Sequence, residues 1–361
     1  MRGNPFPRPL GAQGDGRIGA KRQSRAKRKK AGAEASAWVA VSEGFEPPVR
    51  CRTPVFEAGS FMNLNEEVRC DYLISSDMKK LWAEFLDIYD QIDQICKRHG
   101  LTVIADGGTL LGAVRHQGFI PWDDDFDLDM YIDDYEKFIE YCKDELKEPY
   151  FLQTCETEPG YPPFHLKVRK GGTTCITDWE LEMSPEGHRG IFVDIFPIYN
   201  VPDDDAVFAK QVKKLKKIRK IYGYYQIDRA LTKFGVKKTK FKAKQQLLWK
   251  LHSIFTSPEK LCRQYMDLCK LEKNKTKRVS VISFDPGNKK LVWDRTWFDK
   301  TVELPFEDIT ILGPHMYDEV LTSQFGDWHQ FVKGTSLHSG LNFSVDIDYH
   351  DYIKDLKARA K

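Results

Sequence analysis

The stretch GGTLLGAVRHQGFIPWDDDFDLDM, residues 107–130, contains the signals that decide the fold. Just before it, the β-branched run LTVIA at residues 101–105 predicts a short buried strand that enters a tight glycine turn. A helix is expected to begin on this turn at Thr109. Gly118 and Pro121 then interrupt the chain before a second strand. This order of strand, turn, helix and strand predicts a mixed α and β structure.

The segment DFDLDMYI, residues 125–132, alternates between carboxylate and apolar side chains. Successive side chains of a strand point to opposite faces, so one face should enter the core while the other carries three carboxylates. Carboxylates about 6.5 to 7 Å apart repel one another and need a counter-charge. The expected core residues are Phe126, Leu128 and Met130, and the carboxylates are those of Asp125, Asp127 and Asp129.

A divalent cation is the natural counter-charge for these acids. Ligands that are all oxygen favour Mg²⁺ or Mn²⁺ over zinc, which prefers Cys and His. A calcium-binding loop that begins at Asp123 would need Gly at its sixth position and Glu at its twelfth. The chain has Leu128 and Asp134 there, so this alternative fails. An acidic strand edge that faces water is the alternative left open.

The turn formed by Asp106, Gly107, Gly108 and Thr109 has the form of a phosphate-binding turn: two residues without side chains, helix N–H groups and a hydroxyl. Gly-Gly turns are common, so the turn alone is weak evidence. Farther along, Asp194 lies at the centre of an apolar strand predicted for residues 190–199. A glycine turn, an Asp-x-Asp strand and a later lone Asp follow one another as in polymerase-β-like nucleotidyltransferases.

Two helices and a hairpin are predicted around these motifs. Apolar residues at steps of three and four predict an amphipathic helix between Ser75 and Gly100. Residues 133–147 predict another helix, whose buried side holds Phe138, Ile139, Cys142 and Leu146.

Residues 164–177 predict a hairpin that closes near its two glycines. One face of this hairpin carries His165, Lys167 and Arg169. Lys167 and Arg169 either neutralise phosphate charge in a transition state or lie on an exposed edge. The sequence leaves both interpretations open.

Beyond residue 203 the chain becomes helical and strongly basic up to Lys244. An apolar face formed by Val212, Leu215, Ile218 and Tyr222 beneath the lysines would suit a membrane surface or an anionic substrate. A solvated helix face is the simpler alternative. Near the C-terminus, a strand is expected at Trp293 and a helix between Pro314 and Gly326.

The chain has 361 residues, of which 41% are hydrophobic, enough for one large core or two modest ones. No stretch approaches the roughly 18 to 20 apolar residues that span a bilayer, and no signal peptide is recognisable. We therefore expect a cytoplasmic protein. Its eight cysteines include no C-x-x-C pair and are expected to be reduced.

Residues 1–61 differ from the rest of the chain. They contain 12 Lys and Arg against 5 Asp and Glu, whereas residues 62–361 contain 44 against 48. This segment has three interpretations: a disordered tail, an arm that binds nucleic acid or anionic membranes, or translated upstream non-coding DNA with Met62 as the true start. The intact mass of the protein from its native host tests the third interpretation, which a chain that retains residues 1–61 would contradict.

Residues 107–130 resemble, without gaps, the signature of the LicD and fukutin-related phosphotransferases. The segments KVRKGGTTCI, GIFVDIFPIY, LPFEDI and QFGDW follow in the order of that family, so the resemblance spans roughly Leu81 to Phe331. Asp129 departs from the pattern, because a small residue is expected there. This extra acid puts metal number and substrate charge in doubt.

The resemblance implies an α/β (α+β) fold with a nucleotidyltransferase-type mixed sheet, flanking helices and a helical C-terminal extension. The chain divides into a basic extension at 1–61, a catalytic core at 62–202, a basic helical region at 203–280, and residues 281–361 as the C-terminal part of the same LicD-like domain. The implied reaction transfers a phospho-alcohol such as phosphocholine from a CDP-activated donor. The implied acceptor is a hydroxyl of a cell-surface glycan, such as a lipopolysaccharide or teichoic acid precursor, which is a saccharide or a lipid-linked glycan.

The resemblance also assigns roles to single residues. Asp125 and Asp127 would bridge two Mg²⁺ or Mn²⁺ ions about 3.5 to 4 Å apart. Asp194 would join one metal and accept a proton from the acceptor, and Asp123 would be a metal or neighbouring ligand. These four acids are the expected metal site, and Asp125, Asp127 and Asp194 the catalytic residues. The donor phosphates would contact Gly107, Gly108, Thr109, Arg115, Lys167 and Arg169.

Several alternatives accompany these expectations. Arg115 could instead be a surface arginine, and Trp122 is better explained by core packing than by binding a quaternary ammonium. The acids would equally permit transfer of a nucleotide to a protein or a small molecule. A non-catalytic nucleic-acid-binding protein is the weakest alternative, because it gives the acids no purpose, so no nucleic acid is expected as a partner. A lipid-linked acceptor would place the protein at the inner membrane face, with the basic region after Lys210 as a peripheral contact.

Overall fold

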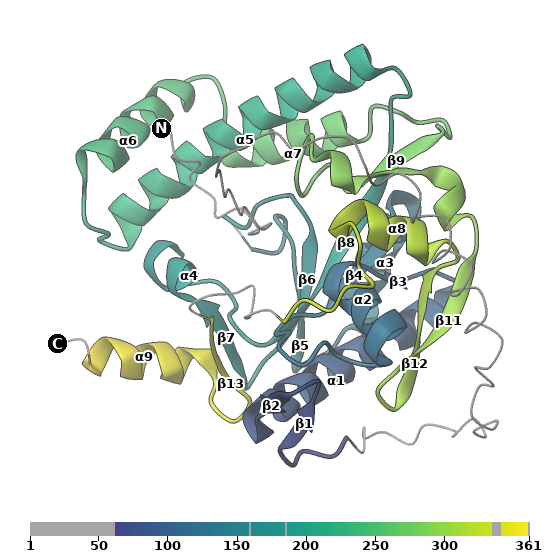
Figure 1. The fold of residues 1–361 in the computed structure, drawn as a ribbon. Helices are drawn as coiled ribbons and strands as arrows, with labels where there is room; N and C mark the ends of the chain where they lie inside the picture. Colours follow the sequence, from purple (N-terminus) through teal and green to yellow (C-terminus); the bar gives the residue numbers. More distant parts are fainter. Residues whose placement is uncertain (1–61, 159, 185, 334–340, 360–361) are drawn as a thin grey trace, which may run out of the picture. The chain divides into compact units, whose positions relative to one another are not determined.

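The computed structural model describes residues 62–158, 160–184, 186–333 and 341–359. The extension at 1–61 and its three interpretations lie outside the described residues. In the described part, the main sheet has seven strands (Figure 1). Its strands are β3 (Ile104–Ala105), β4 (Asp127–Tyr131), β5 (Tyr150–Gln153), β6 (Leu166–Lys170), β8 (Phe192–Val201), β9 (Arg278–Ser280) and β10 (Val292–Asp294).

The long strand β8 organises this sheet. On one side it pairs in parallel with β4, which in turn pairs antiparallel with β3. On its other side, its first half pairs antiparallel with β6 and its last residues with β9. Strands β5 and β10 extend the sheet beyond β6 and β9. A sheet that mixes parallel and antiparallel pairs confirms the predicted α+β class.

Three two-stranded sheets lie outside the main sheet. They are β1 (Glu67–Arg69) with β2 (Tyr72–Ile74), β11 (Thr301–Phe306) with β12 (Ile309–Pro314), and β7 (Thr174–Thr177) with β13 (Leu341–Ser344). The hairpin predicted for residues 164–177 is therefore wrong, because β6 and β7 do not pair with each other. Both edges of β6 are already bonded to β5 and β8, and β7 takes its partner from the C-terminal end of the chain.

The first helix, α1 (Ser76–His99), confirms the prediction from apolar periodicity. Ser75 caps its start by accepting a hydrogen bond from the Met78 N–H at 3.2 Å, and Gly100 ends it with a φ of 62°. Tyr89 of α1 packs against Phe126 with ring centroids 5.5 Å apart. The apolar face predicted around the acidic segment thus packs against α1.

The helices near the acidic segment deviate slightly from the predicted bounds. Helix α2 (Gly107–His116) begins two residues before Thr109, and β3 has only two of the five residues expected for its strand. Helix α3 (Ile132–Glu145) buries Phe138 and Cys142 as predicted, with Ile139 and Leu146 partly buried.

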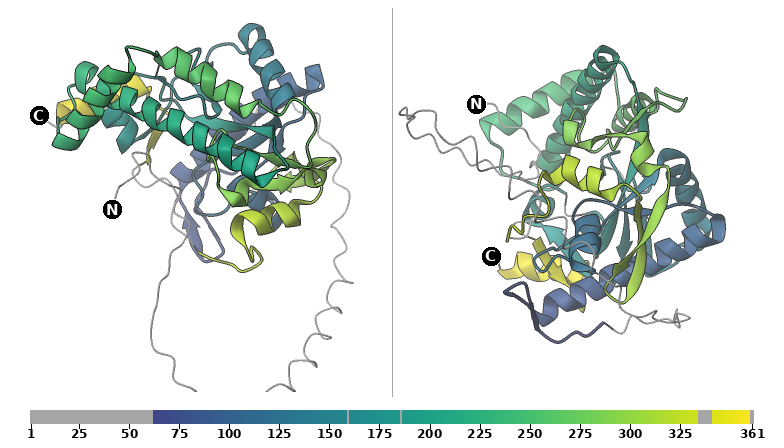
Figure 2. Two further views of the ribbon diagram at one scale, coloured as in Figure 1. Left: turned by 90° about the horizontal axis from the view of Figure 1, so that it is seen from above. Right: turned by 45° about the vertical axis from the view of Figure 1, so that its right-hand side comes forward.

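The basic region contains α5 (Asp205–Lys233), α6 (Lys240–His252) and α7 (Pro258–Cys269), which pack together (Figures 1 and 2). Leu215 and Tyr222 are buried, and Val212 and Ile218 pack against the buried clusters. This apolar face of α5 is used inside the protein, so the membrane contact predicted through it is wrong. The α5 lysines are exposed, as expected for a solvated helix face.

The remaining helices are short. They are α4 (Asp178–Met183), η1 (Lys289–Leu291), η2 (Arg295–Phe298), α8 (Tyr317–Phe325) and α9 (Tyr349–Arg359). Helix α8 starts three residues after the predicted Pro314, which ends β12, and it ends at Gly326 as predicted. Among the described residues, no helix has the length and apolar character to cross a bilayer. Every cysteine within the described residues is a free thiol, and Cys51 lies outside them.

Candidate active site

The register of three neighbouring strands gathers side chains that lie far apart in the sequence. Asp127 of β4 lies directly opposite Asp194 of β8, and Lys167 of β6 lies opposite Asp194 on its other side. Residues that pair directly across strands project to the same face of a sheet. The acidic strand, the lone aspartate and one basic residue of the predicted hairpin face thus meet on one face.

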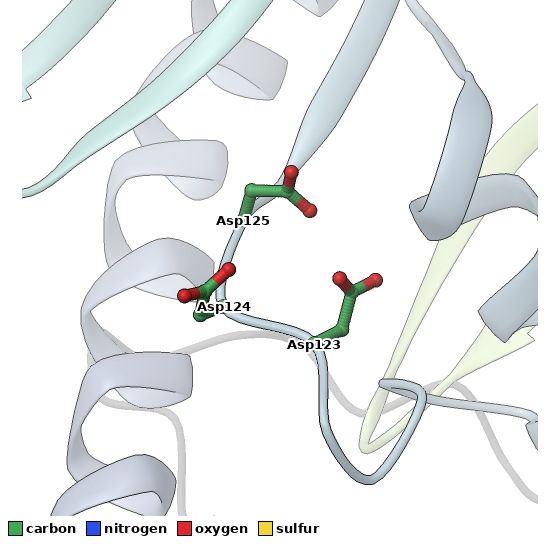
Figure 3. A group of neighbouring side chains, drawn as sticks. All are labelled: Asp123, Asp124 and Asp125. Carbon is green, nitrogen blue, oxygen red and sulfur yellow. The ribbon is translucent and has the colours of Figure 1, made fainter. Parts of the chain in front are cut away.

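Three more acids occupy the loop that leads into β4. Asp123, Asp124 and Asp125 are buried, and one carboxylate oxygen of each lies within 4.8 Å of the others (Figure 3). Figure 3 shows Asp123 and Asp125 turned toward a common space. The predicted strand of residues 125–132 starts only at Asp127, so Asp125 belongs to this loop. The sequence analysis did not select Asp124, although the Asp-Asp-Asp run was a visible signal.

The glycine turn lies directly against these acids. Gly107 has a φ of 53°, which favours glycine, and a Cβ there would lie 3.4 Å from Asp127 Oδ2. A Cβ on Gly108 would lie only 2.4 Å from Asp123 Oδ2. The Asp127 N–H donates a hydrogen bond of 2.8 Å to Thr109 Oγ1. The turn therefore borders the acids without side chains of its own, and Thr109 fixes the start of β4.

The carboxylates are crowded and buried, which changes their ionisation. Burial raises the pKa of Asp123 and that of Asp127 well above the ordinary value, and the nearby Asp125 charge adds to both effects. Burial would also raise the pKa of Asp194, but Lys167 and His165 reverse this and lower it. Lys167 Nζ lies 2.7 Å from Asp194 Oδ1.

The donor set of the cluster fits a hard divalent cation. The four expected ligands, Asp123, Asp125, Asp127 and Asp194, all offer carboxylate oxygens, and the absence of a side chain at Gly108 lets the Asp123 carboxylate lie against the glycine turn. Asp194 has Lys167 as a basic partner. In the described structure, Asp123 and Asp127 are instead repelled by neighbouring carboxylates. A cation such as Mg²⁺ or Mn²⁺ would relieve this repulsion.

His165 is a site neighbour that the sequence analysis did not select. Its Nε2 lies 3.1 Å from Asp194 Oδ1, and its ring packs against Phe196 and Phe284. The spacing of His165 two residues before Lys167 was the available signal, but it became meaningful only through the pairing of β6 with β8.

Arg169 and Lys167 share a face but have different surroundings. The Arg169 side chain is 0% exposed and donates hydrogen bonds of 2.7 Å to Gln153 Oε1 and to the Gly190 carbonyl. Its guanidinium also lies 3.5 Å from Glu180. The exposed-edge interpretation of Lys167 and Arg169 is wrong, because β6 lies between two strands. The contacts of Arg169 favour a structural role, and phosphate binding by it remains a prediction.

Arg115 and Trp122 contact the segment after α8. Arg115 Nη1 donates a 3.0 Å hydrogen bond to the Trp328 carbonyl, and its guanidinium lies 5.2 Å from the centre of the Phe331 ring. Arg115 is thus half-buried rather than a free surface arginine. Trp122 is buried and packs edge-on against Phe331 and Tyr72, which confirms the core interpretation.

Asp129, the departure from the family pattern, is only 1% exposed. Its Oδ1 has no hydrogen-bond partner in the described part of the chain. Burial, and next the Asp106 charge, raise the pKa of Asp129 well above its ordinary value. Asp106 itself accepts a 2.6 Å hydrogen bond from Gln324. Asp129 therefore lies in the protein interior, where burial disfavours its charged form.

Comparison with known proteins covers the whole cluster. Residues 100–218 match the family model described as LicD/FKTN/FKRP, nucleotidyltransferase domain. The chain is 27% identical over 250 residues to the lipopolysaccharide cholinephosphotransferase LicD of Haemophilus influenzae. That alignment covers 67% of this chain and 88% of the relative. The glycine turn, the loop acids, Lys167 and Asp194 all fall within the residues that the family model matches.

Proposed function

We propose that this chain, whose residues 100–218 match the LicD/FKTN/FKRP family model, is a phosphotransferase that moves a phospho-alcohol from a CDP-activated donor to a hydroxyl of a cell-surface glycan. The alcohol is proposed to be choline or a similar small alcohol, because the relative from Haemophilus influenzae is a cholinephosphotransferase. The acceptor is proposed to be a lipopolysaccharide-type or teichoic-type precursor, the former because that relative is a lipopolysaccharide cholinephosphotransferase.

The observation that carries this proposal is the meeting of Asp127 and Asp194 beside a glycine turn. The two carboxylates lie opposite each other in a parallel strand pair, and Gly107 approaches Asp127 on the same β4 strand. An acidic strand edge that faces water would leave these acids exposed, but Asp194 is buried and Asp127 is partly buried. Buried acids without a sufficient counter-charge are typical of sites that bind charged ligands.

The chain's own residues suit the binding and orientation of a diphosphate. The glycine turn places the backbone N–H groups at the start of α2 beside the acids, where they could bind donor phosphates. Lys167 brings a positive charge to the same face. Asp194 stays ionised because of its lowered pKa, so it is suited to accept a hydrogen bond from the acceptor hydroxyl and is a weak proton acceptor.

A divalent cation would be held by Asp123, Asp125, Asp127 and Asp194. When bound, it would neutralise the charge of the transferring phosphate and of its leaving group. We propose Mg²⁺ or Mn²⁺, because all these ligands are oxygen atoms.

The family model also describes a nucleotidyltransferase domain, which favours transfer of a nucleotide as the second candidate. The products separate the two reactions. Transfer of a phospho-alcohol from a CDP-activated donor releases CMP, whereas transfer of a nucleotide from a triphosphate releases pyrophosphate.

The test is CMP release from CDP-choline by the purified protein with Mg²⁺ or Mn²⁺ and a crude host glycan fraction. Release should require metal, acceptor and Asp127, so Asp127→Ala should abolish it. Asp144→Ala, which changes an exposed acid of α3, is the matched control and should retain activity. Nucleotide incorporation from a triphosphate, without CMP release, would move the function to nucleotidyl transfer.

We further propose that residues 62–202 and 281–361 form the catalytic domain and that 203–280 is a helical region inserted into it. In support, β10 (Val292–Asp294), which follows the helical region, joins the sheet that carries the site through β9 at the end of that region. The nucleotide-activated donor suggests a cytoplasmic enzyme that acts at the inner membrane face.

A further inference from the structure

Helix α6 and the turn after it expose apolar side chains that a protein surface normally hides. Ile254 is 70% exposed and Phe255 is 80% exposed. Leu247 and Leu251, four residues apart, share one side of α6 and lead into this turn. The apolar patch consists of Phe241, Leu247, Leu251, Ile254 and Phe255, all exposed in the described structure.

The orientation of α6 makes this exposure specific. Its polar residues Gln245 and Gln246 are buried, and Gln246 donates a 3.0 Å hydrogen bond to Asp228 of α5. Trp249 is also buried, packed against Tyr225 with ring centroids 5.2 Å apart. Beside Leu248 and Trp249, the helix thus buries two glutamine side chains while Leu247 and Leu251 face outward, whereas a water-facing helix normally exposes its polar residues.

The segment that carries the patch has ionisable side chains of positive charge. Residues 229–258 contain eight Lys and Arg and no Asp or Glu. Two of the lysines pair with acids of the α4 region, Lys242 with Glu182 and Lys233 with Glu186. Within the described ranges, five exposed lysines of this segment form no ion pair, namely Lys237, Lys238, Lys240, Lys244 and Lys250.

A groove continues from the patch toward α5 and α7. It has a volume of about 370 Å³ and is lined by Phe255 together with Lys214, Lys217 and Lys260. An apolar surface with a lysine-lined groove beside it offers places for acyl chains and for an anionic headgroup.

We propose that the apolar patch and the lysines around it bind the surface of an anionic lipid bilayer. The apolar side chains enter the boundary between headgroups and acyl chains, and the lysines remain at the headgroup level. This inference deepens the proposed function on which it rests, because an acceptor carried by a membrane lipid requires the enzyme at the membrane. It also moves the contact from the buried α5 face to the outer side of α6.

The experiment is co-sedimentation of the full chain with vesicles of phosphatidylcholine alone and with added phosphatidylglycerol. We expect binding to the anionic vesicles and little binding to phosphatidylcholine alone. Leu247→Gln or Phe255→Gln should weaken binding by about tenfold, and Lys244→Gln by about fivefold at low salt.

Matched controls distinguish this contact from nonspecific adsorption of the protein to vesicles. Leu73 of β2 and Leu247 are both 59% exposed, so Leu73→Gln should leave vesicle binding unchanged. Lys143→Gln on α3 is the control for charge. Melting temperatures should be unchanged in all these variants, because the residues are on the surface.

Absence of vesicle binding, or equal binding by wild type and Phe255→Gln, would overturn the proposal. So would a wild-type dimer that Phe255→Gln makes monomeric, since the patch would then bind a second copy. Binding of RNA in preference to vesicles, abolished by Lys244→Gln, would also overturn it. The assay contains no donor, so CMP release with a detergent-dispersed acceptor tests the proposed function separately.

Discussion

Lys167 Nζ lies 2.7 Å from Asp194 Oδ1, and the two side chains are only 12% and 11% exposed. This buried ion pair gives Asp194 a counter-charge that Asp123 and Asp127 do not have in the described structure. Lys167 also lies 3.4 Å from the centre of the Phe192 ring, so its position is fixed by packing as well as by charge. A cation held by these acids would therefore share Asp194 with Lys167.

The first prediction concerns Lys167→Gln. Removal of one partner of a buried ion pair leaves an uncompensated charge and should lower the free energy of unfolding by about 3 kcal/mol without metal. Mg²⁺ would restore the counter-charge, so it should raise the melting temperature of the variant more than that of wild type. Thermal unfolding with and without Mg²⁺ checks this, with Lys143→Gln as an exposed control. Equal Mg²⁺ shifts in variant and wild type would contradict the shared role of Asp194.

The second prediction tests the contact between the glycine turn and Asp123. A Cβ on Gly108 would lie 2.4 Å from Asp123 Oδ2, and the carboxylate can rotate away because it is the end of a side chain. Gly108→Ala should therefore reduce kcat by about a hundredfold, as for a displaced ligand, with little change in melting temperature. CMP release gives kcat for this comparison.

The double variant Gly108→Ala/Asp123→Ala provides the control. Once Asp123 has lost its carboxylate, the added methyl group has nothing to displace. The double variant should therefore be no less active than Asp123→Ala alone. Fully additive losses would mean that Gly108 acts independently of Asp123.

The sequence predicted the parts of the site that depend on local patterns. The alternation around Phe126, Leu128 and Met130 predicted a core face, and all three are buried. The contacts of Lys167 with Asp194 depend on pairing between strands 27 residues apart, which no local pattern specifies. Strand β7 pairs with β13, which lies still farther along the chain. The predicted hairpin was wrong because no local pattern indicates this pairing. The burial of Asp129 was likewise not predicted by the local pattern, which placed it with the other carboxylates.

The third prediction tests whether Arg169 stabilises the fold or binds the donor directly. Arg169→Met would leave Gln153 and the Gly190 carbonyl without their donor and would remove one of the two arginines beside Glu180. The free energy of unfolding should fall by about 3 kcal/mol. At a temperature where the variant stays folded, KM for CDP-choline should change less than about threefold. A rise in KM of about a hundredfold with unchanged stability would show instead that Arg169 binds the donor phosphates.

The fourth prediction concerns acid sensitivity and His188. Burial, followed by the charges of Arg169 and Arg189, lowers the pKa of His188 from 6.5 to about 3. The Gly190 N–H donates to His188 Nδ1 at 3.2 Å, which requires the unprotonated nitrogen, and the ring stacks on Phe151. His188 therefore remains neutral in the folded protein in a pH range where it would be protonated in the unfolded chain.

The direction in which pH changes the stability follows from proton linkage. Below pH 6.5 the unfolded chain binds a proton at His188 that the folded protein does not, so stability falls as the pH falls from 6.5 toward about 3. His188→Asn keeps an acceptor for Gly190 but cannot be protonated. Between about pH 7.5 and about pH 5, this variant should lose about 1 kcal/mol less stability than wild type, allowing for partial solvent screening. Urea unfolding at both pH values measures the difference, with His329→Asn on an exposed loop as the control. An identical loss in wild type and His188→Asn would mean that the acid sensitivity arises from other groups.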